Sequence, residues 1–192
     1  MKKVVCVLGS PRRHKNTETI ARKLLESAER AGAETQIFVL NELDYKGCQA
    51  CQACKTGAEE CVVDDDLKQV LQAVSEADVV VLASPIYYGH VSGQMKSFVD
   101  RTYSYLVPDF LNAQNPSRLA PGKQCVFVLA QGDPDPSHFD IYPQFEEWFS
   151  SRYYGMKSYL IRGLGVGEQV DKQGVPDDLL RQAEDLGKRL AS

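Results

Sequence analysis

Hydroxyl, amide and cationic side chains crowd the stretch that follows the first apolar run of the chain. Residues 4–8 are uninterrupted hydrophobic sequence, and residues 9–17 then read Gly-Ser-Pro-Arg-Arg-His-Lys-Asn-Thr. A ring of such side chains can surround the three free oxygens of a phosphate monoester, as in FMN. Apolar residues recur at helical spacing directly afterwards, so a helix N-terminus capped by Asn16 or Thr17 would add unpaired amides. We therefore predict a monophosphate site in this phosphate loop, residues 9–17.

Two commoner nucleotide motifs are missing from the phosphate loop. No Gly-Lys pair with a following Ser or Thr comes after Gly9, as a Walker loop requires, and no three-glycine dinucleotide fingerprint occurs. The glycine-rich run 163–167 has the wrong spacing for that fingerprint, and we interpret it as a flexible loop. An ordinary strand-to-helix turn is the remaining alternative for residues 9–17.

Four cysteines lie within a segment of fourteen residues, in the pattern C-x2-C-x2-C-x6-C: Cys48, Cys51, Cys54 and Cys61. Three thiolates separated by two residues can converge on one four-iron four-sulfur cluster, and a fourth can close the site after a turn containing Gly57. The proline that usually follows a ferredoxin-type cysteine is replaced by Val62. A tetrahedral zinc site and a set of free thiols are kept as alternatives for this cysteine loop, residues 45–63.

Composition excludes several classes of protein. The 192 residues carry a net charge of −4, from 22 basic and 26 acidic residues, so neither a nucleic-acid surface nor a polybasic membrane patch is expected. No apolar stretch approaches a membrane span, and the apolar run after residues 1–3 is too short for a signal-peptide core. We expect a cytoplasmic protein without structural disulfides. Cys6 and Cys125 lie in apolar strands and are interpreted as core residues.

Strands alternate with amphipathic helices along the chain. Apolar runs predict strands at 4–8, 34–40, 77–83, 125–130 and 157–161. Helices are predicted from residue 16, from the three aspartates 64–66, from residue 92, at 137–151 with Trp148 facing inward, and at 177–190. The alternation predicts one α/β domain over residues 1–192, with an irregular, proline-containing insertion at 104–121. Its expected fold is a flavodoxin-like, doubly wound five-stranded parallel sheet in the order 2-1-3-4-5, with helices on both faces.

In that strand order, ligands bind outside the carboxyl ends of the first and third strands. The first strand leads into the phosphate loop and the third into a predicted loop at 84–91. Tyr87 and Tyr88 offer stacking area there, and Gly89 permits close backbone approach, as an isoalloxazine ring would need. Two tyrosines that merely cap the core are the alternative. The loop that begins with Gln131 and Gly132, after the fourth strand, should form a third wall.

These motifs together resemble the NADPH-dependent FMN reductase group of flavodoxin-like proteins, and within it the iron-sulfur flavoproteins. The resemblance extends from Val4 to about Arg101. It includes Gly-Ser-Pro-Arg followed by Asn-Thr, the cysteine segment ending in three aspartates, Ser-Pro-Ile-Tyr-Tyr-Gly at 84–89, and Ser-Gly-Gln-Met-Lys-Ser-Phe-Val-Asp-Arg at 92–101. It implies that the FMN phosphate is held by Ser10, Arg12, Asn16, Thr17 and Thr19. It also implies a flavin ring lined by Pro85, Ile86, Tyr87, Tyr88 and Gly89, near an interface of a homodimer or homotetramer.

Two functions are expected from such a protein. An enzyme would take electrons from NADPH or NADH through FMN and pass them to a flavin, a quinone or a similar small-molecule acceptor. Alternatively, an iron-sulfur flavoprotein carrier would exchange single electrons with a ferredoxin-like partner. A regulatory flavodoxin-like binding module is a third option. His14, His90 and His138 form no hydrolytic triad by spacing, so no catalytic side chain is assigned.

Overall fold

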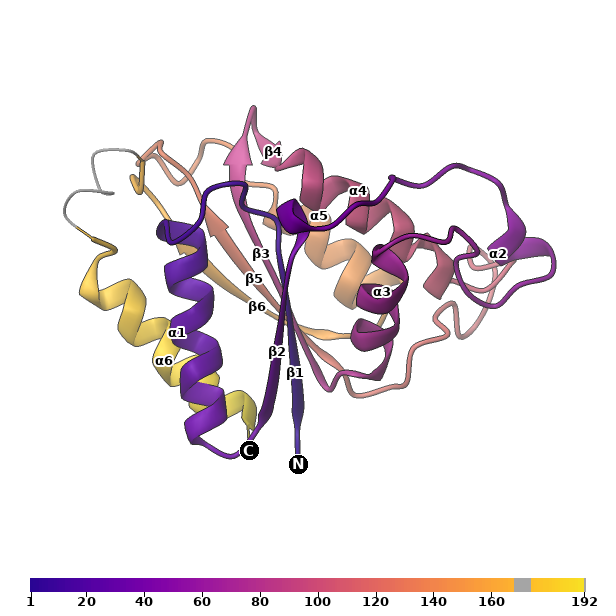
Figure 1. Ribbon diagram of the computed structural model, residues 1–192, viewed down its shortest axis with the longest axis horizontal. Coiled ribbons are helices and arrows are strands. Elements are labelled where there is room, and N and C mark those ends of the chain that lie inside the picture. The colour runs from indigo at the N-terminus through magenta and orange to yellow at the C-terminus, as the bar shows by residue number, and fades with distance from the viewer. Residues whose placement is uncertain (168–173, 192) are drawn as a thin grey trace.

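A computed structural model describes residues 1–167 and 174–191 of the chain. Its central feature is one parallel sheet (Figure 1). The parallel strands are β1 (Lys3–Leu8), β2 (Glu34–Val39), β3 (Val79–Tyr87), β5 (Gln124–Ala130) and β6 (Lys157–Gly163). They are ordered β2-β1-β3-β5-β6, and every neighbouring pair is parallel. This confirms the predicted order, with β5 and β6 as the fourth and fifth strands expected.

Helices cover both faces of the sheet (Figure 1). One face carries α1 (Asn16–Arg30) and α6 (Asp177–Ala191), and the other carries α3 (Leu67–Glu76), α4 (Gly93–Arg101) and α5 (Tyr142–Glu146). Alternate residues of each strand face opposite layers, so the core divides into two clusters, one containing Cys6 and the other Cys125. Both cysteines are fully buried, as predicted. The architecture is the flavodoxin-like α/β fold.

The pairing of α1 with α6 brings two helix backbones into contact. A Cβ added to Gly187 would lie 2.3 Å from the carbonyl oxygen of Leu24, so only glycine fits at the crossing. The Ser27 hydroxyl donates to the carbonyl of Glu184 at 2.7 Å beside it. This contact holds α1 and α6 together on one face of the sheet.

Two predicted helix starts are corrected. Helix α1 begins at Asn16 with Lys15 as its N-cap and has no side-chain cap bond, because a lysine side chain offers no acceptor. The Asn16 amide donates to the carbonyl of Val166 at 2.8 Å. Helix α3 begins at Leu67, after the three aspartates, and a carboxylate oxygen of Asp65 accepts the Leu67 N–H at 3.1 Å. The Asp65 carboxylate also accepts from the Lys46 N–H at 3.1 Å and from Arg101, contacts that spacing along the sequence does not reveal.

The predicted loop at 84–91 is wrong, since β3 continues to Tyr87 and folds back as an antiparallel hairpin onto β4 (His90–Val91). The turn residues Tyr88 and Gly89 have φ values of 49° and 74°. Two left-handed residues match the right-handed twist of the flanking strands, which is the requirement of a two-residue hairpin turn. Residues 84–92 are therefore an aromatic hairpin rather than a loop.

The predicted helix at 137–151 begins only at Tyr142, the first residue of α5. The preceding residues 131–140 form a loop that is held by hydrogen bonds from Gln131 and Arg162. A turn of π-helix, η3 (Glu147–Arg152), follows α5, and Trp148 is 39% exposed rather than inward-facing. Phe145 and Phe149 are buried as predicted. The run 163–167 is anchored rather than flexible, since Val166 is buried and its N–H donates to the carbonyl of Gln131 at 2.9 Å.

The remaining elements are short. They are η1 (Leu40–Glu42), α2 (Ala53–Thr56) inside the cysteine loop, and η2 (Thr102–Tyr105) at the start of the insertion. The insertion is irregular as predicted, apart from an isolated bridge between Leu106 and Ser117. Within the described ranges, no helix is long and apolar enough to cross a lipid bilayer.

Candidate functional site

The phosphate loop starts where β1 meets the N-terminus of α4. The Gly9 N–H donates to the carbonyl of Ala83 in β3 at 2.8 Å, and the Gly9 carbonyl accepts from the Ser92 hydroxyl at 2.6 Å. A Cβ at Gly9 would lie 2.7 Å from the Cβ of Met95 in α4, which is closer than side-chain carbons approach. Glycine at this position therefore lets the loop backbone lie directly on α4.

Two buried serines join the aromatic hairpin to the phosphate loop. Besides donating to Gly9, the Ser92 hydroxyl accepts the Met95 N–H at 3.2 Å and so caps α4. The Ser92 N–H donates to the Ser84 hydroxyl at 3.0 Å, which itself donates to the Pro85 carbonyl at 2.8 Å. The sequence motifs assigned no role to either serine; the position of Ser92 before an apolar helix face was the one available signal.

The structure brings the predicted phosphate residues together at the carboxyl end of β1. Ser10, Asn16 and Thr17 are buried there, and Thr19 is half-buried one turn into α1. The Ser10 hydroxyl accepts the Arg12 N–H at 3.3 Å and donates to the Arg12 carbonyl at 3.1 Å, which curls the loop tightly. The Asn16 amide is bonded to the anchored run 163–167 and thus positions the helix N-terminus.

A buried carboxylate, Glu18, stabilises the loop from within. It accepts the His14 N–H at 2.6 Å and the Arg22 Nε–H at 2.8 Å, and it pairs with Arg13 at 3.3 Å. Burial on its own would raise the pKa of Glu18, but these hydrogen bonds lower it below the ordinary value, so the group is ionised. The bond to His14 holds that residue at a φ of 55°, a left-handed conformation that a non-glycine residue seldom adopts.

Aromatic rings stand at the same end of the sheet. Tyr87 is 41% exposed and Tyr88 is fully exposed, so neither tyrosine caps the core. Phe139, at a φ of 55° and half exposed, packs over the hairpin turn, with a ring carbon 3.0 Å from where a Cβ on Gly89 would lie. Pro85 is buried and Ile86 half-buried beneath the turn. Phe139 was missed because it fell inside a predicted helix.

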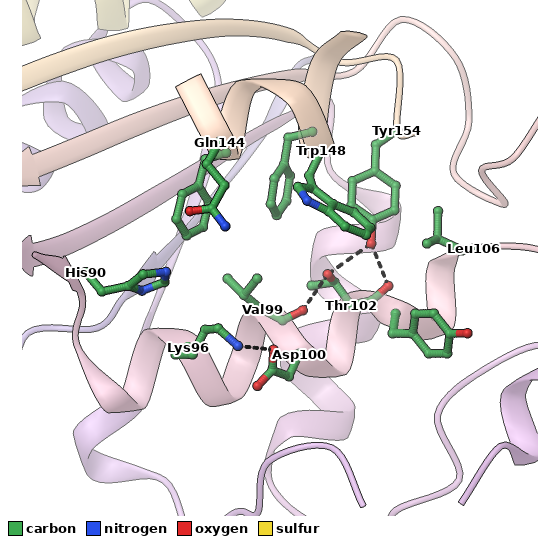
Figure 2. A pocket seen from close by; sticks show the side chains of 12 residues that line it. His90, Lys96, Val99, Asp100, Thr102, Leu106, Gln144, Trp148 and Tyr154 are labelled. Atoms are coloured by element: carbon green, nitrogen blue, oxygen red, sulfur yellow. Dashed lines mark hydrogen bonds and ion pairs between the residues drawn. The ribbon is translucent and has the colours of Figure 1, made fainter. Parts of the chain in front are cut away.

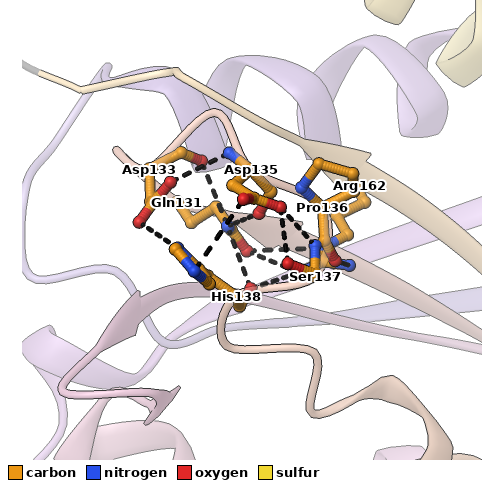
Figure 3. Close-up of polar contacts among 7 residues, drawn as sticks. All are labelled: Gln131, Asp133, Asp135, Pro136, Ser137, His138 and Arg162. Atoms are coloured by element: carbon orange, nitrogen blue, oxygen red, sulfur yellow. Dashed lines mark hydrogen bonds and ion pairs between the residues drawn. The ribbon is translucent and has the colours of Figure 1, made fainter.

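The third wall, residues 131–140, is organised by a network in which Gln131 and Arg162 are central (Figure 3). The buried Gln131 amide nitrogen lies 3.1 to 3.4 Å from the carbonyl oxygens of three loop residues, including Asp133 and His138, and donates to them. Its oxygen accepts from Arg162 Nη2 at 3.0 Å, and Arg162 also donates to the His138 carbonyl at 2.7 Å. Gln131 therefore holds the shape of this wall by hydrogen bonds to other protein groups. Gly132 lies close to the backbone of Gly167.

A pocket of about 270 Å³ opens between α4 and the segment formed by α5 and η3 (Figure 2). Its walls are mainly aromatic and include Phe145, Trp148 and Tyr154. The Thr102 and Tyr154 hydroxyls lie 3.1 Å apart and donate to backbone carbonyls, so the polar atoms at its end are satisfied. His90 of the aromatic hairpin also lines this pocket, so the pocket lies beside the hairpin.

The four clustered cysteines surround one small pocket of about 20 Å³ at the opposite end of α4 from the hairpin. Cys48 and Cys51 are exposed, and Cys54 and Cys61 are half-buried. The turn residues Ala50 and Gln52 both have left-handed φ values, 51° and 59°, a strain that clusters at functional sites. Within residues 1–167 and 174–191, no three His, Cys, Asp or Glu side chains are already drawn together as metal ligands. The four cysteines match a four-thiolate cluster in ligand type and number, but their sulfurs are not yet arranged as ligands around one centre.

Three cations make contacts in or beside the cysteine loop. Arg101 reaches it from the end of α4, and its Nε lies 3.0 Å from the sulfur of Cys61. Lys55 donates to the Tyr103 carbonyl at 2.6 Å, and Arg118 of the insertion donates to the Cys54 carbonyl at 3.1 Å. Burial alone would lower the pKa of Arg101, but its bonds to Asp65 and Cys61 raise it. Through Arg118 the irregular insertion contacts the backbone of the loop.

Burial favours the protonated form of one thiol of the loop, Cys54, before any ligand binds. Burial raises the pKa of Cys54; Lys55 opposes this rise, and the other three thiols add to it. Ligation by iron or zinc requires a thiolate, so binding must release the proton that burial favours on Cys54.

A family model for NADPH-dependent FMN reductases matches residues 2–135. The chain belongs to the NADPH-dependent FMN reductase family. It is also 37% identical over 189 residues to an iron-sulfur flavoprotein of Archaeoglobus fulgidus, an alignment that covers 98% of this chain and 79% of the relative. An iron-sulfur flavoprotein of Methanocaldococcus jannaschii is 36% identical over 100 residues, which are 52% of this chain and about half, 51%, of that relative.

Solved structures support the fold of this FMN reductase family member. An FMN-dependent NADH-azoreductase of Bacillus anthracis, solved in complex with FMN, matches with a TM-score of 0.73 at 15% identity, over 100% of both chains. At that identity the likeness shows the fold alone. Family membership makes the chain an FMN-dependent NAD(P)H oxidoreductase.

Proposed function

We propose that this FMN reductase family member transfers electrons from NADPH or NADH to a small-molecule acceptor, a flavin, a quinone or a similar compound, at the carboxyl ends of β1 and β3. The observation that carries the proposal is the chain of hydrogen bonds from Gly9 through Ser92 to Ser84, which joins the phosphate loop to the aromatic hairpin. The two loops are thereby fixed at one site before a cofactor binds, so little ordering cost is left to binding.

Each part of the site has a separate task in this proposal. Ser10, Arg12, Asn16, Thr17 and Thr19, with the N-terminus of α1, bind the FMN phosphate. Pro85, Ile86, Tyr87, Tyr88 and Gly89 bind the ring, with Gln131 and Gly132 shaping the opposite wall. Bound FMN supplies hydride and single-electron chemistry, which the protein side chains do not. Tyr87 is 41% exposed and leaves a face on which a nicotinamide can be bound and oriented.

A second function, single-electron exchange with a ferredoxin-like partner, is favoured by the cysteine loop. Cys48, Cys51, Cys54 and Cys61 line one pocket, and a relative 37% identical over nearly the whole chain is named an iron-sulfur flavoprotein. In this proposal the four sulfurs hold a four-iron four-sulfur cluster; zinc and free thiols are the competing occupants. A cluster bound here supplies single-electron chemistry, and the loop residues hold and shield it.

The setting of the protein is part of the proposal. We place it in the cytoplasm, where thiols stay reduced, as one domain over residues 1–192. A homodimer or homotetramer would cover the fully exposed Tyr88 at the tip of the aromatic hairpin.

Anaerobic rapid mixing of the FMN-loaded protein with NADPH, NADH or reduced ferredoxin separates the two functions. Fast flavin bleaching by NADPH or NADH, followed by turnover with a quinone, is the result expected of the reductase. Bleaching by reduced ferredoxin alone would instead support the carrier. No reduction by any of the three donors would contradict both proposals.

A further inference from the structure

Arg101 is a fully buried arginine whose partners all belong to one segment. It closes α4 and is 1% exposed. Its Nε–H points to the Cys61 sulfur at 3.0 Å, Nη1 donates to the Lys46 carbonyl at 2.9 Å, and Nη2 donates to the Val63 carbonyl at 3.2 Å. The two oxygens of Asp65 accept from Nη1 at 2.8 Å and from Nη2 at 3.2 Å. All five N–H donors of the guanidinium are therefore used.

The order of these partners along the chain shows what the guanidinium does. Lys46 precedes the first of the four cysteines, whereas Val63 and Asp65 follow the last. One rigid planar group thus bridges both limbs of the cysteine loop at its base and contacts one of its sulfurs. Lysine lacks the planar fork and has fewer donors, so it cannot reproduce this set of contacts.

The other two cations near the loop act differently. Lys55 and Arg118 are half-buried and bond to carbonyls of the loop or the insertion, Lys55 at Tyr103 and Arg118 at Ser104 and Cys54. Neither is hydrogen-bonded to a cysteine sulfur in the described structure. Arg101 is distinguished from them by its burial, by its position between the two limbs and by its contact with Cys61.

We propose that Arg101 is the positioning residue of the cysteine loop: it clamps the two limbs together and fixes the Cys61 sulfur as the anchored ligand of an iron-sulfur cluster. The inference rests on the cluster proposed above. Cys61 is held in advance, whereas Cys48 and Cys51 are exposed and can close onto a cluster as it assembles. A hydrogen bond and a positive charge at a ligand sulfur stabilise the reduced cluster and raise its reduction potential.

The matched variants are Arg101→Lys and, as a control, Arg118→Lys, which touches loop backbone but no sulfur. Each FMN-loaded protein is reconstituted anaerobically with iron and sulfide. We expect Arg101→Lys to keep its FMN, to lose iron to a chelator about tenfold faster than wild type, and to hold a cluster of lower midpoint potential. The Arg118→Lys protein is expected to match wild type in iron retention and in potential. Wild-type iron retention and potential in Arg101→Lys would overturn the proposal.

A second variant covers the case in which Arg101→Lys fails to fold. Arg101→Gln combined with Asp65→Asn removes both charges together, so no unpaired carboxylate is left beside the loop. The same measurements apply to this double variant. Retained FMN together with faster iron loss and a lower midpoint potential of the cluster would support the clamp. Wild-type values in this double variant overturn it.

Hydrogen exchange in the protein before reconstitution separates failure of the clamp from failure of the cluster. If the clamp exists, amides of residues 45–63 exchange about tenfold faster in Arg101→Lys than in wild type or Arg118→Lys. Unchanged exchange there refutes the clamp. If wild type takes up no iron, the cluster proposal and the role of Cys61 as its ligand both fail, and the exchange result alone decides whether Arg101 holds the loop.

Discussion

Two regions of the molecule gather residues from distant parts of the sequence, and they do so by different means. The phosphate loop and the aromatic hairpin meet through backbone atoms and two serine hydroxyls at the ends of adjacent strands. The cysteine loop is held by long cationic side chains, Arg101 above all. Sheet topology thus determines the first region, whereas the second depends on the contacts of a few charged side chains. A backbone substitution should therefore destabilise the first region more than the second.

The largest effect is expected at Gly9, where the backbone of the phosphate loop lies against α4. Gly9→Ala places a Cβ 2.7 Å from the Cβ of Met95 and should lower the free energy of unfolding by about 1–3 kcal/mol, measured by urea titration. The matched change in the cysteine loop, Gly47→Ala, meets Ser97 only at 3.5 Å and should change stability by less than about 0.5 kcal/mol. Equal losses in both variants would remove the contrast between the regions.

The second prediction concerns ligand affinity. Ser10→Ala combined with Thr17→Ala should weaken FMN binding by about 1–3 kcal/mol, since each neutral hydrogen bond contributes about 0.5–1.5 kcal/mol. Riboflavin, which lacks the phosphate, should bind as it does to wild type. Fluorescence titration with both ligands measures this difference. Tyr87→Ala is the opposite control, because loss of ring contact should weaken both ligands alike; equal loss for both in the double variant would place the phosphate elsewhere.

The third prediction tests the link between the loops. Ser92→Ala removes the cap of α4 and the donor to the Gly9 carbonyl, at a cost of about 0.5–2 kcal/mol in the free energy of unfolding. Ser75→Ala removes an exposed hydroxyl that donates to the Gln72 carbonyl within α3, and should cost less than about 0.5 kcal/mol. Chemical denaturation of both variants decides it, and a neutral Ser92→Ala would mean that the hydrogen bonds do not join the loops.

The fourth prediction is a pH dependence carried by Glu18. Its folded-state pKa lies below the ordinary value of 4.5, so its stabilisation is present above that value and is lost as pH falls through the folded-state pKa. Glu18→Gln should be less stable than wild type at neutral pH, with the difference shrinking on acidification below about pH 4.5. Urea unfolding across this range measures it. A difference independent of pH would assign the loss to packing instead.

The smallest effect is expected on FMN affinity when the cysteine loop is altered. Cys51→Ala should remove the proposed cluster, seen as lost iron and absorbance, while FMN affinity stays at the wild-type value because distant sites act independently. Weaker FMN binding in that variant would show that the cysteine loop and the flavin site are coupled.

The same contrast explains how far the sequence could be interpreted. Strand order, the position of the phosphate loop and the burial of Cys6 and Cys125 were predictable, because apolar periodicity reports burial and parallel sheets bring carboxyl ends together. The aromatic hairpin was missed because Ile86 and Val91 pair beyond the end of the sheet, so a strand continues into a predicted loop.

Contacts made by long side chains were not predictable in the same way. The bridge from Arg101 to Asp65 and Cys61 joins residues 36 and 40 positions apart, and the Gln131 to Arg162 bond spans 31 positions. No periodicity connects such pairs. Glu18 was passed over for a different reason, because an acidic residue in the first turn of a helix is ordinarily solvated, whereas Glu18 is fully buried.

The turn of the aromatic hairpin has a further consequence. Tyr88 is held at a φ of 49°, where asparagine or glycine would be accommodated at lower cost, and its ring lies wholly outside the folded chain. A tyrosine in this conformation lowers the stability of the hairpin by about 1–2 kcal/mol relative to an unstrained residue. The hairpin is therefore less stable than it would be with glycine or asparagine at this position, and it presents an exposed aromatic ring instead. A substitution at Tyr88 chosen to raise stability would remove the contacts that this ring makes with a ligand or a partner.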